Sequence, residues 1–194
     1  MLVRIALLLV VTAGAARQLE TPTKDPVSES PESHVKRMLL QVESPAFKAN
    51  EAIPRKHTGD GEDVSPEIHW SGIPKDARQL ALICEDPDAP SPEPWVHWVI
   101  YQIPIGSMGL TENTPKKEKL ETPVGAVQGK NSWGTVGYRG PAPPKGHGVH
   151  HYHFRVYALS QPLDIGPGKT KAELLAAMKD HILAEGELVG TYKR

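Results

Sequence analysis

The sequence is short of cysteine, with Cys84 alone among 194 residues, and neither sign of charge dominates it. A single cysteine excludes an intramolecular disulfide, so the fold must be held together by its core. The 22 basic and 23 acidic side chains nearly cancel, which argues against nucleic acid or an anionic membrane surface as the main partner. Any recognition of an anion must therefore be local.

The sequence also lacks an apolar run of the roughly 20 residues needed to cross a bilayer. Its apolar run at residues 5–11 follows Arg4 and precedes the small residues 13–16, an order typical of a signal peptide. We expect residues 1–16 to be a signal peptide cleaved near Ala15 or Ala16, and the protein to be exported to a periplasm or secreted. The mature chain should carry no transmembrane anchor.

Residues 17–35 have almost no apolar side chains and are rich in proline, serine, threonine and charge. Such a segment buries too little surface to offset the cost of ordering it, which predicts a disordered tether. From residue 36 onward, short β-type runs at 79–85, 95–103 and 150–159 alternate with loops rich in proline and glycine. This pattern predicts one mainly-β domain over residues 36–194 rather than parallel βαβ units.

One helix is predicted near the C-terminus. Thr170 is a capping residue with Glu173 three positions later, and apolar residues follow at helical spacing. We expect the helix to run to about Ala184 and to stop at Gly186. Residues 187–192 then return as a final strand.

Two acidic residues follow directly on the apolar strand at 79–85. Strand alternation puts Asp86 on the same face as Leu80, Leu82 and Cys84, which is the core face. A carboxylate there needs a hydrogen-bonding or charged partner, because an unpaired buried charge is very costly. The alternative is a turn-capping role before proline, which suits Asp88 better than Asp86.

The strand at 95–101 carries one histidine between two apolar faces. Alternation places His97 with Trp95, Val99 and Tyr101. Taken alone, this strand indicates a satisfied core histidine as readily as a functional one.

A stiff loop of proline and glycine at 140–149 leads into the strand at 150–159. Alternation back from Phe154 puts Tyr152 and His150 on the core face, and His151 and His153 on the opposite face. An inward histidine and tyrosine at the mouth of a rigid loop are typical of a small preformed pocket. The outward pair could share a metal ion, but no cysteine or carboxylate nearby completes a ligand set, so we predict no functional metal site.

Taken in order, residues 86–90 (DPDAP), 95–97 (WVH) and 140–152 (GPAPPKGHGVHHY) resemble the phosphatidylethanolamine-binding protein family, which is also known through its Raf kinase inhibitor members. The bacterial-type branch is the closer match, and the similarity covers roughly residues 37–192. The resemblance implies a mainly-β fold in which a large antiparallel-rich sheet packs against a smaller sheet.

The resemblance also implies a small pocket for a phosphate-like or other anionic ligand, with no cofactor, and a possible homodimer. The ligand-binding residues it implies are Asp86, His97, Pro143, Pro144, His150 and Tyr152, supported by Asp88, Gly146 and Gly148. The segment 91–94 is shorter than in animal relatives, and a tyrosine that lines their pocket has no obvious counterpart. Lipid binding therefore does not carry over automatically.

These residue types suit the capture of an anion. Asp86 would favour a protonated imidazole, so that His97 or His150 donates to phosphoryl oxygens, and Tyr152 adds a neutral donor. Two alternatives remain: a regulator that binds another protein at the pocket rim, and a hydrolase using aspartate, histidine and tyrosine. The hydrolase is disfavoured because the sequence has no Gly-x-Ser-x-Gly or His-Glu-x-x-His motif.

Overall fold

Nine strands and two short helices make up the computed structural model, which describes residues 38–194. In chain order they are β1 (Met38–Leu39), β2 (Gln41–Glu43), the 3-10 helix η1 (Arg55–His57), β3 (Ile68–Ser71), β4 (Gln79–Asp86), β5 (Trp95–Pro104), β6 (Gly109–Leu110), β7 (Val127–Gln128), β8 (His150–Leu159), α1 (Lys171–Met178) and β9 (Ile182–Tyr192).

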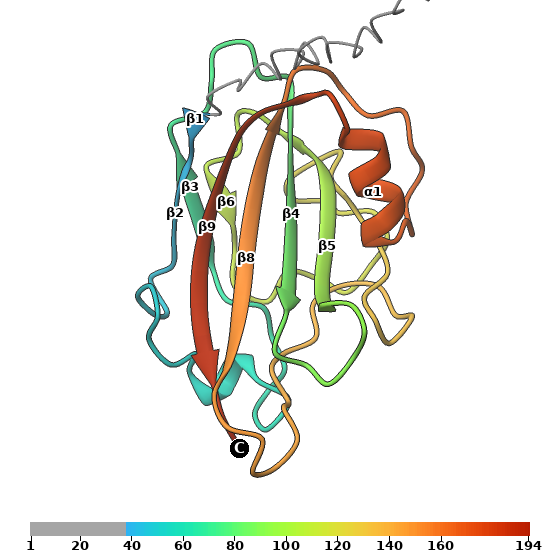
Figure 1. Cartoon of the computed structure of the whole chain (residues 1–194). Coiled ribbons are helices and arrows are strands. Elements are labelled where there is room, and N and C mark those ends of the chain that lie inside the picture. The colour runs from blue at the N-terminus through green and yellow to red at the C-terminus, as the bar shows by residue number, and fades with distance from the viewer. Residues whose placement is uncertain (1–37) are drawn as a thin grey trace, which may run out of the picture. The chain divides into compact units, whose positions relative to one another are not determined.

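The strands form two sheets (Figure 1). The larger has the order β1-β9-β8-β4-β5-β7 and the smaller the order β2-β3-β6. The long strands β5, β4, β8 and β9 are antiparallel neighbours, and only the short β1 runs parallel to its partner β9. The prediction of a mainly-β fold, with a large antiparallel-rich sheet against a smaller one, is confirmed.

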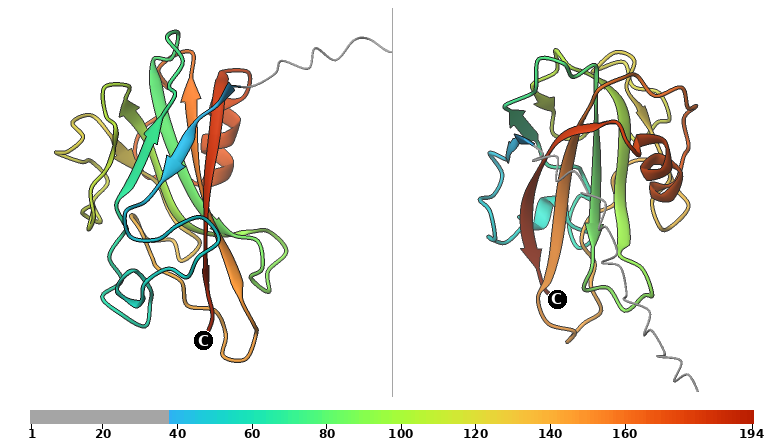
Figure 2. Two further views of the ribbon diagram at one scale, coloured as in Figure 1. Left: turned by 90° about the vertical axis from the view of Figure 1, so that its left-hand side faces the viewer. Right: turned by 45° about the horizontal axis from the view of Figure 1, so that its top comes forward.

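The large sheet is covered on both faces, by the small sheet on one side and by α1 on the other (Figure 2). Alternate residues of β4 therefore enter two different cores. Leu80 and Leu82 pack toward the small sheet, whereas Ala81 and Ile83 pack with Leu174 on the helix side. Burial on both faces explains why this strand is a continuous apolar run.

Strand β5 departs from simple alternation at His97. Cys84 of β4 pairs with Trp98, and the next residue, Glu85, pairs with Val96. His97 is therefore the extra residue of a β-bulge. Val99 and Tyr101 pack in the core under α1, but His97 turns to the opposite side of the sheet, where it lines a cavity. The prediction that these three residues share a face is therefore wrong.

Helix α1 begins as predicted but ends early. The Thr170 hydroxyl accepts from the Glu173 backbone N–H, and the Glu173 carboxylate accepts from the Thr170 backbone N–H. The helix stops at Met178 rather than near Ala184, and Asp180 adopts a positive φ of 66° in the turn that follows. The chain then enters β9, where Ala184 pairs with Ala158 of β8.

Gly186 lies inside β9 and does not stop a helix. A Cβ atom at this position would overlap the carbonyl oxygen and the side chain of Leu40, which lies directly against β9 after the parallel strand β1. The glycine is needed for this close approach of two backbones. The sequence analysis singled out Gly186 but interpreted it as the end of a helix rather than as a close contact within a strand.

The predicted signal peptide (1–16) and tether (17–35) lie outside the described residues. Within residues 38–194, no helix has the length and apolar character needed to cross a membrane.

Candidate functional site

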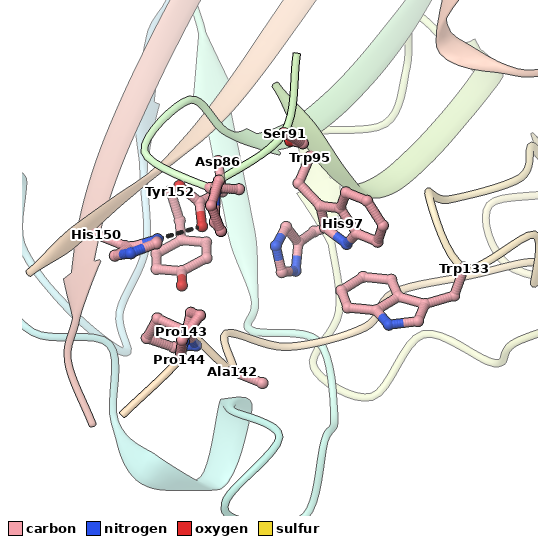
Figure 3. Close-up of a pocket in the computed structure, with 12 residues that line it drawn as sticks. Asp86, Ser91, Trp95, His97, Trp133, Ala142, Pro143, Pro144, His150 and Tyr152 are labelled. Carbon is pink, nitrogen blue, oxygen red and sulfur yellow. Dashed lines mark hydrogen bonds and ion pairs between the residues drawn. The ribbon is translucent and has the colours of Figure 1, made fainter. Parts of the chain in front are cut away.

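A cavity of about 230 Å³ opens at one end of the large sheet, where β4 ends and β5 and β8 begin (Figure 3). Because these strands are antiparallel neighbours, their ends bring together residues far apart in the sequence. All six ligand-binding residues predicted from the sequence line this cavity. Its full lining is Asp86, Ala89, Pro90, Ser91, Trp95, His97, Trp133, Ala142, Pro143, Pro144, His150 and Tyr152.

Asp86 and His150 form a buried pair on one side of the cavity. His150 Nδ1 donates to Asp86 Oδ2 over 2.7 Å, and their side chains are only 2 % and 5 % exposed. The other oxygen, Asp86 Oδ1, accepts from the Asp88 backbone N–H over 2.9 Å. The two roles considered for Asp86, pairing with a buried group and capping a turn, are both present.

His150 is also held from its other ring nitrogen. Its Nε2 lies 3.0 Å from Nδ1 of His147, which sits in the loop before β8 between Gly146 and Gly148. These two glycines have φ values of +78° and +97°, a conformation that favours glycine. With both ring nitrogens engaged, His150 has no free N–H to offer a ligand in this arrangement.

His97 is buried and neutral at ordinary pH. Its Nδ1 lies 2.5 Å from the carbonyl oxygen of Arg139, and since a carbonyl only accepts, Nδ1 carries the proton. Burial lowers the pKa of His97 to about 4, although the Arg139 hydrogen bond and the Asp86 charge act in the opposite direction. At His97 desolvation thus outweighs the carboxylate, which opposes an imidazolium donor at this position.

The Tyr152 hydroxyl is a buried polar group with no hydrogen-bond partner among the described residues. Its ring stands edge-on to His97, with centroids 5.1 Å apart, and Figure 3 shows the hydroxyl directed toward Pro143 and Pro144. Burial, the charge of Asp86 and, less strongly, the approach of the Asp86 carboxylate raise the pKa of Tyr152, so the group stays a neutral O–H. The carboxylate does not reach the distance and angle of a hydrogen bond to this hydroxyl. An unsatisfied buried hydroxyl costs about 1–3 kcal/mol, which a bound partner would recover.

Trp133 forms a pocket wall that was not predicted from the sequence. Its ring packs edge-to-face against Trp95 and His97, with centroids 5.3 and 5.1 Å apart. The Arg139 guanidinium lies over the Trp133 ring, 4.8 Å from its centroid. Asn131 fixes the local turn by accepting from the Trp133 backbone N–H. The only local sequence feature that points to this wall is a tryptophan in a turn that also contains asparagine and glycine.

Asp88 lies outside the cavity lining and stabilises the adjoining loop. Its Oδ2 accepts from both the backbone N–H and the ring Nδ1 of His151, each over 2.8 Å. His153, also on the outer face of β8, pairs with Glu187. Within residues 38–194, no group of three or more histidine, cysteine, aspartate or glutamate side chains is placed to hold a metal ion.

Comparison with known proteins gives one consistent result. The model of the phosphatidylethanolamine-binding protein family matches residues 43–193. A UPF0098 protein of Methanothermobacter thermautotrophicus is 50 % identical over 155 residues, which cover 80 % of this chain and 99 % of that protein.

Two crystal structures show the same fold. A putative phosphatidylethanolamine-binding protein homolog of Chlamydia trachomatis is 38 % identical with a TM-score of 0.72. Escherichia coli YbcL is 32 % identical with a TM-score of 0.75. Each match covers 80 % of this chain and 98 % of the other. The chain therefore belongs to the phosphatidylethanolamine-binding protein family.

Proposed function

We propose that the cavity binds a small phosphate-like anion, such as a phosphoryl headgroup, and does not transform it. The observation that carries this proposal is the unpartnered Tyr152 hydroxyl, which is buried in the wall of an otherwise largely apolar pocket. A phosphoryl oxygen is a strong acceptor for such a donor. The name of the matched family, whose eponymous lipid has a phosphoryl headgroup, supports the same ligand class.

The charges of Arg139 and Asp86 support an anion. Arg139 has no acidic partner among the described residues, and its guanidinium is held over Trp133 at the cavity wall. The negative charge of Asp86 is already engaged by His150 and by the Asp88 backbone. An incoming anion therefore meets a compensated carboxylate in the cavity, and the Arg139 cation lies beyond the cavity lining, against Trp133.

The size and stiffness of the cavity support a ligand no larger than a headgroup. Its volume of about 230 Å³ lies below the roughly 300 Å³ at which pockets for drug-sized ligands begin. Pro143 and Pro144 form one wall, and proline fixes its own backbone angle. We therefore propose a preformed subsite for the anionic group alone.

The surroundings of the serine and the thiol near the site support binding without turnover. Ser91 is the one serine in the lining, and its Oγ donates to the Glu93 carbonyl oxygen over 2.6 Å rather than to a histidine. Cys84 is buried, and desolvation raises the pKa of its thiol well above the ordinary value. Neither side chain has the neighbouring base that activates a nucleophile.

Titration calorimetry with inorganic phosphate and O-phosphorylethanolamine tests the proposal. Tyr152→Phe removes the one unpartnered donor, and we expect it to weaken binding by roughly 10-fold or more, since a hydrogen bond to a charged group contributes about 1.5–3 kcal/mol. Tyr157→Phe is the matched control, because this tyrosine lies on the helix-facing side of β8. Absence of binding by the wild-type chain, or equal affinities for wild type and Tyr152→Phe, would contradict the proposal.

A further inference from the structure

Two polar atoms without partners belong to neighbouring rings of the cavity wall. One is the Tyr152 hydroxyl. The other is Nε2 of His97, whose ring makes its single hydrogen bond through Nδ1. The two rings are in edge-to-face contact, so one small ligand can reach both atoms. The hydroxyl can donate, whereas Nε2 of a neutral imidazole protonated at Nδ1 can only accept.

The groups around His97 keep it in this neutral form. The titratable and charged groups that face its ring are Asp86 at the end of β4, His150 and Tyr152 on β8, Asp63 in the segment after η1, and Arg139. Asp86 and Asp63 favour the charged ring, but burial and His150 oppose it, and burial is the largest influence. With the resulting pKa of about 4, protonation at pH 7 is disfavoured by about 1,000-fold.

A fully deprotonated oxyanion does not complement this pair of atoms. One of its oxygens can accept from Tyr152, but another would face the lone pair of His97 Nε2. An oxyanion that carries an acidic proton meets both groups, because its P–O⁻ or P=O accepts from Tyr152 while its P–O–H donates to His97. In this arrangement the proton stays on the ligand oxygen, and no covalent bond forms or breaks.

We propose that His97 is the specificity-determining residue of the pocket, and that it selects oxyanions carrying an acidic proton, such as the monoanion of a phosphate monoester or phosphonate, over oxyanions that lack one, such as sulfate. This inference rests on the proposed function and specifies the ionic form of the ligand. It also predicts that the pH dependence of binding is set by the ligand rather than by a histidine.

The test is calorimetric titration of the full chain with O-phosphorylethanolamine, methylphosphonate and sulfate between pH 5.5 and 8. At pH 5.5 we expect both phosphorus ligands to bind about 10-fold or more tighter than sulfate, because sulfate leaves His97 Nε2 without a donor. Affinity for the monoester should fall above its second pKa of roughly 6. Affinity for methylphosphonate should persist to higher pH, because its second ionisation occurs at higher pH.

Four outcomes would overturn the inference. Equal affinities for sulfate and the phosphorus ligands at pH 5.5 would remove the selectivity while leaving anion binding intact. If the affinities for all three ligands changed at the same pH, the group that titrates would belong to the protein and not to the ligand. Ethanolamine is titrated separately as a control, and tight binding of ethanolamine would identify a cation site. Failure of every oxyanion to bind would reject the proposed function as well, so the two failures are distinguishable.

His97→Gln tests the residue itself, since an amide can donate where His97 only accepts. We expect the ratio of phosphonate to sulfate affinity to fall toward one. His153→Gln is the matched control on the outer face of the sheet, and its ratio should stay at the wild-type value. Nitrogen NMR of the wild-type His97 ring needs no variant: it should show the neutral Nδ1–H tautomer in the phosphonate complex, and an imidazolium there would overturn the proposal.

Discussion

The histidines at and beside the cavity each hydrogen-bond to a different kind of neighbour. His97 donates to a backbone carbonyl, His150 to the buried carboxylate of Asp86, and His153 pairs with Glu187 at the surface. Strand alternation and motif resemblance were enough to place His97 and His150 at one pocket. They could not predict the tautomer of His97, because its partner Arg139 is 42 residues away in the chain.

The buried neutral state of His97 makes a prediction about stability in acid. Its pKa is about 4 in the folded chain against an ordinary 6.5, so the unfolded chain binds the proton more tightly. The contribution to stability is complete above about pH 6.5 and is lost as the pH falls toward 4, by up to about 3 kcal/mol. Urea unfolding of the wild type across this range should show the loss.

His97→Gln provides the comparison for this stability effect. Carboxylates remote from His97 that titrate in the same range affect both proteins equally, so the difference between the two unfolding free energies reports His97 together with its coupling to Asp86 and Asp63. We expect that difference to shrink as the pH drops from 6.5 to 4. Parallel curves for the two proteins would show that His97 is not a buried neutral group.

At the scale of the element, β9 depends on a glycine that sequence reasoning assigned to a helix end. Gly186→Ala places a methyl group against Leu40, and we expect a loss of about 1–3 kcal/mol in unfolding free energy, as for other overpacked sites. Gly166→Ala is the matched control, since nothing lies within 4 Å of a Cβ at that position. Thermal or urea unfolding of both variants measures the effect, and equal stabilities would refute the close approach.

Strand alternation predicted the face of a side chain correctly where neighbouring strands pair regularly, and incorrectly where a β-bulge interrupts the pairing. It placed Asp86 on β4 and Tyr152 on β8 correctly, because both strands pair without interruption where β8 adjoins β4. It failed at His97, because the β-bulge in β5 shifts the pattern by one residue and leaves no local mark in the sequence. The helix was extended too far because Ile182 follows Met178 by four residues, a spacing that also fits a helix.

At the scale of the whole molecule, the motifs predicted the family and the two-sheet architecture, because they are spread over most of the chain. Trp133 was missed because its segment, between β7 and β8, has no periodic pattern, and only the folded chain brings it against Trp95 and His97. Export through residues 1–16 and formation of a homodimer stay predictions.

The most direct test of the central claim is a crystal structure of the chain grown with phosphate. We expect tetrahedral electron density in the cavity, within hydrogen-bonding distance of the Tyr152 hydroxyl and of His97 Nε2. Phosphate would then supply the partner that this buried hydroxyl lacks. A cavity that holds only water at saturating phosphate, with the anion bound elsewhere on the surface, would contradict the account.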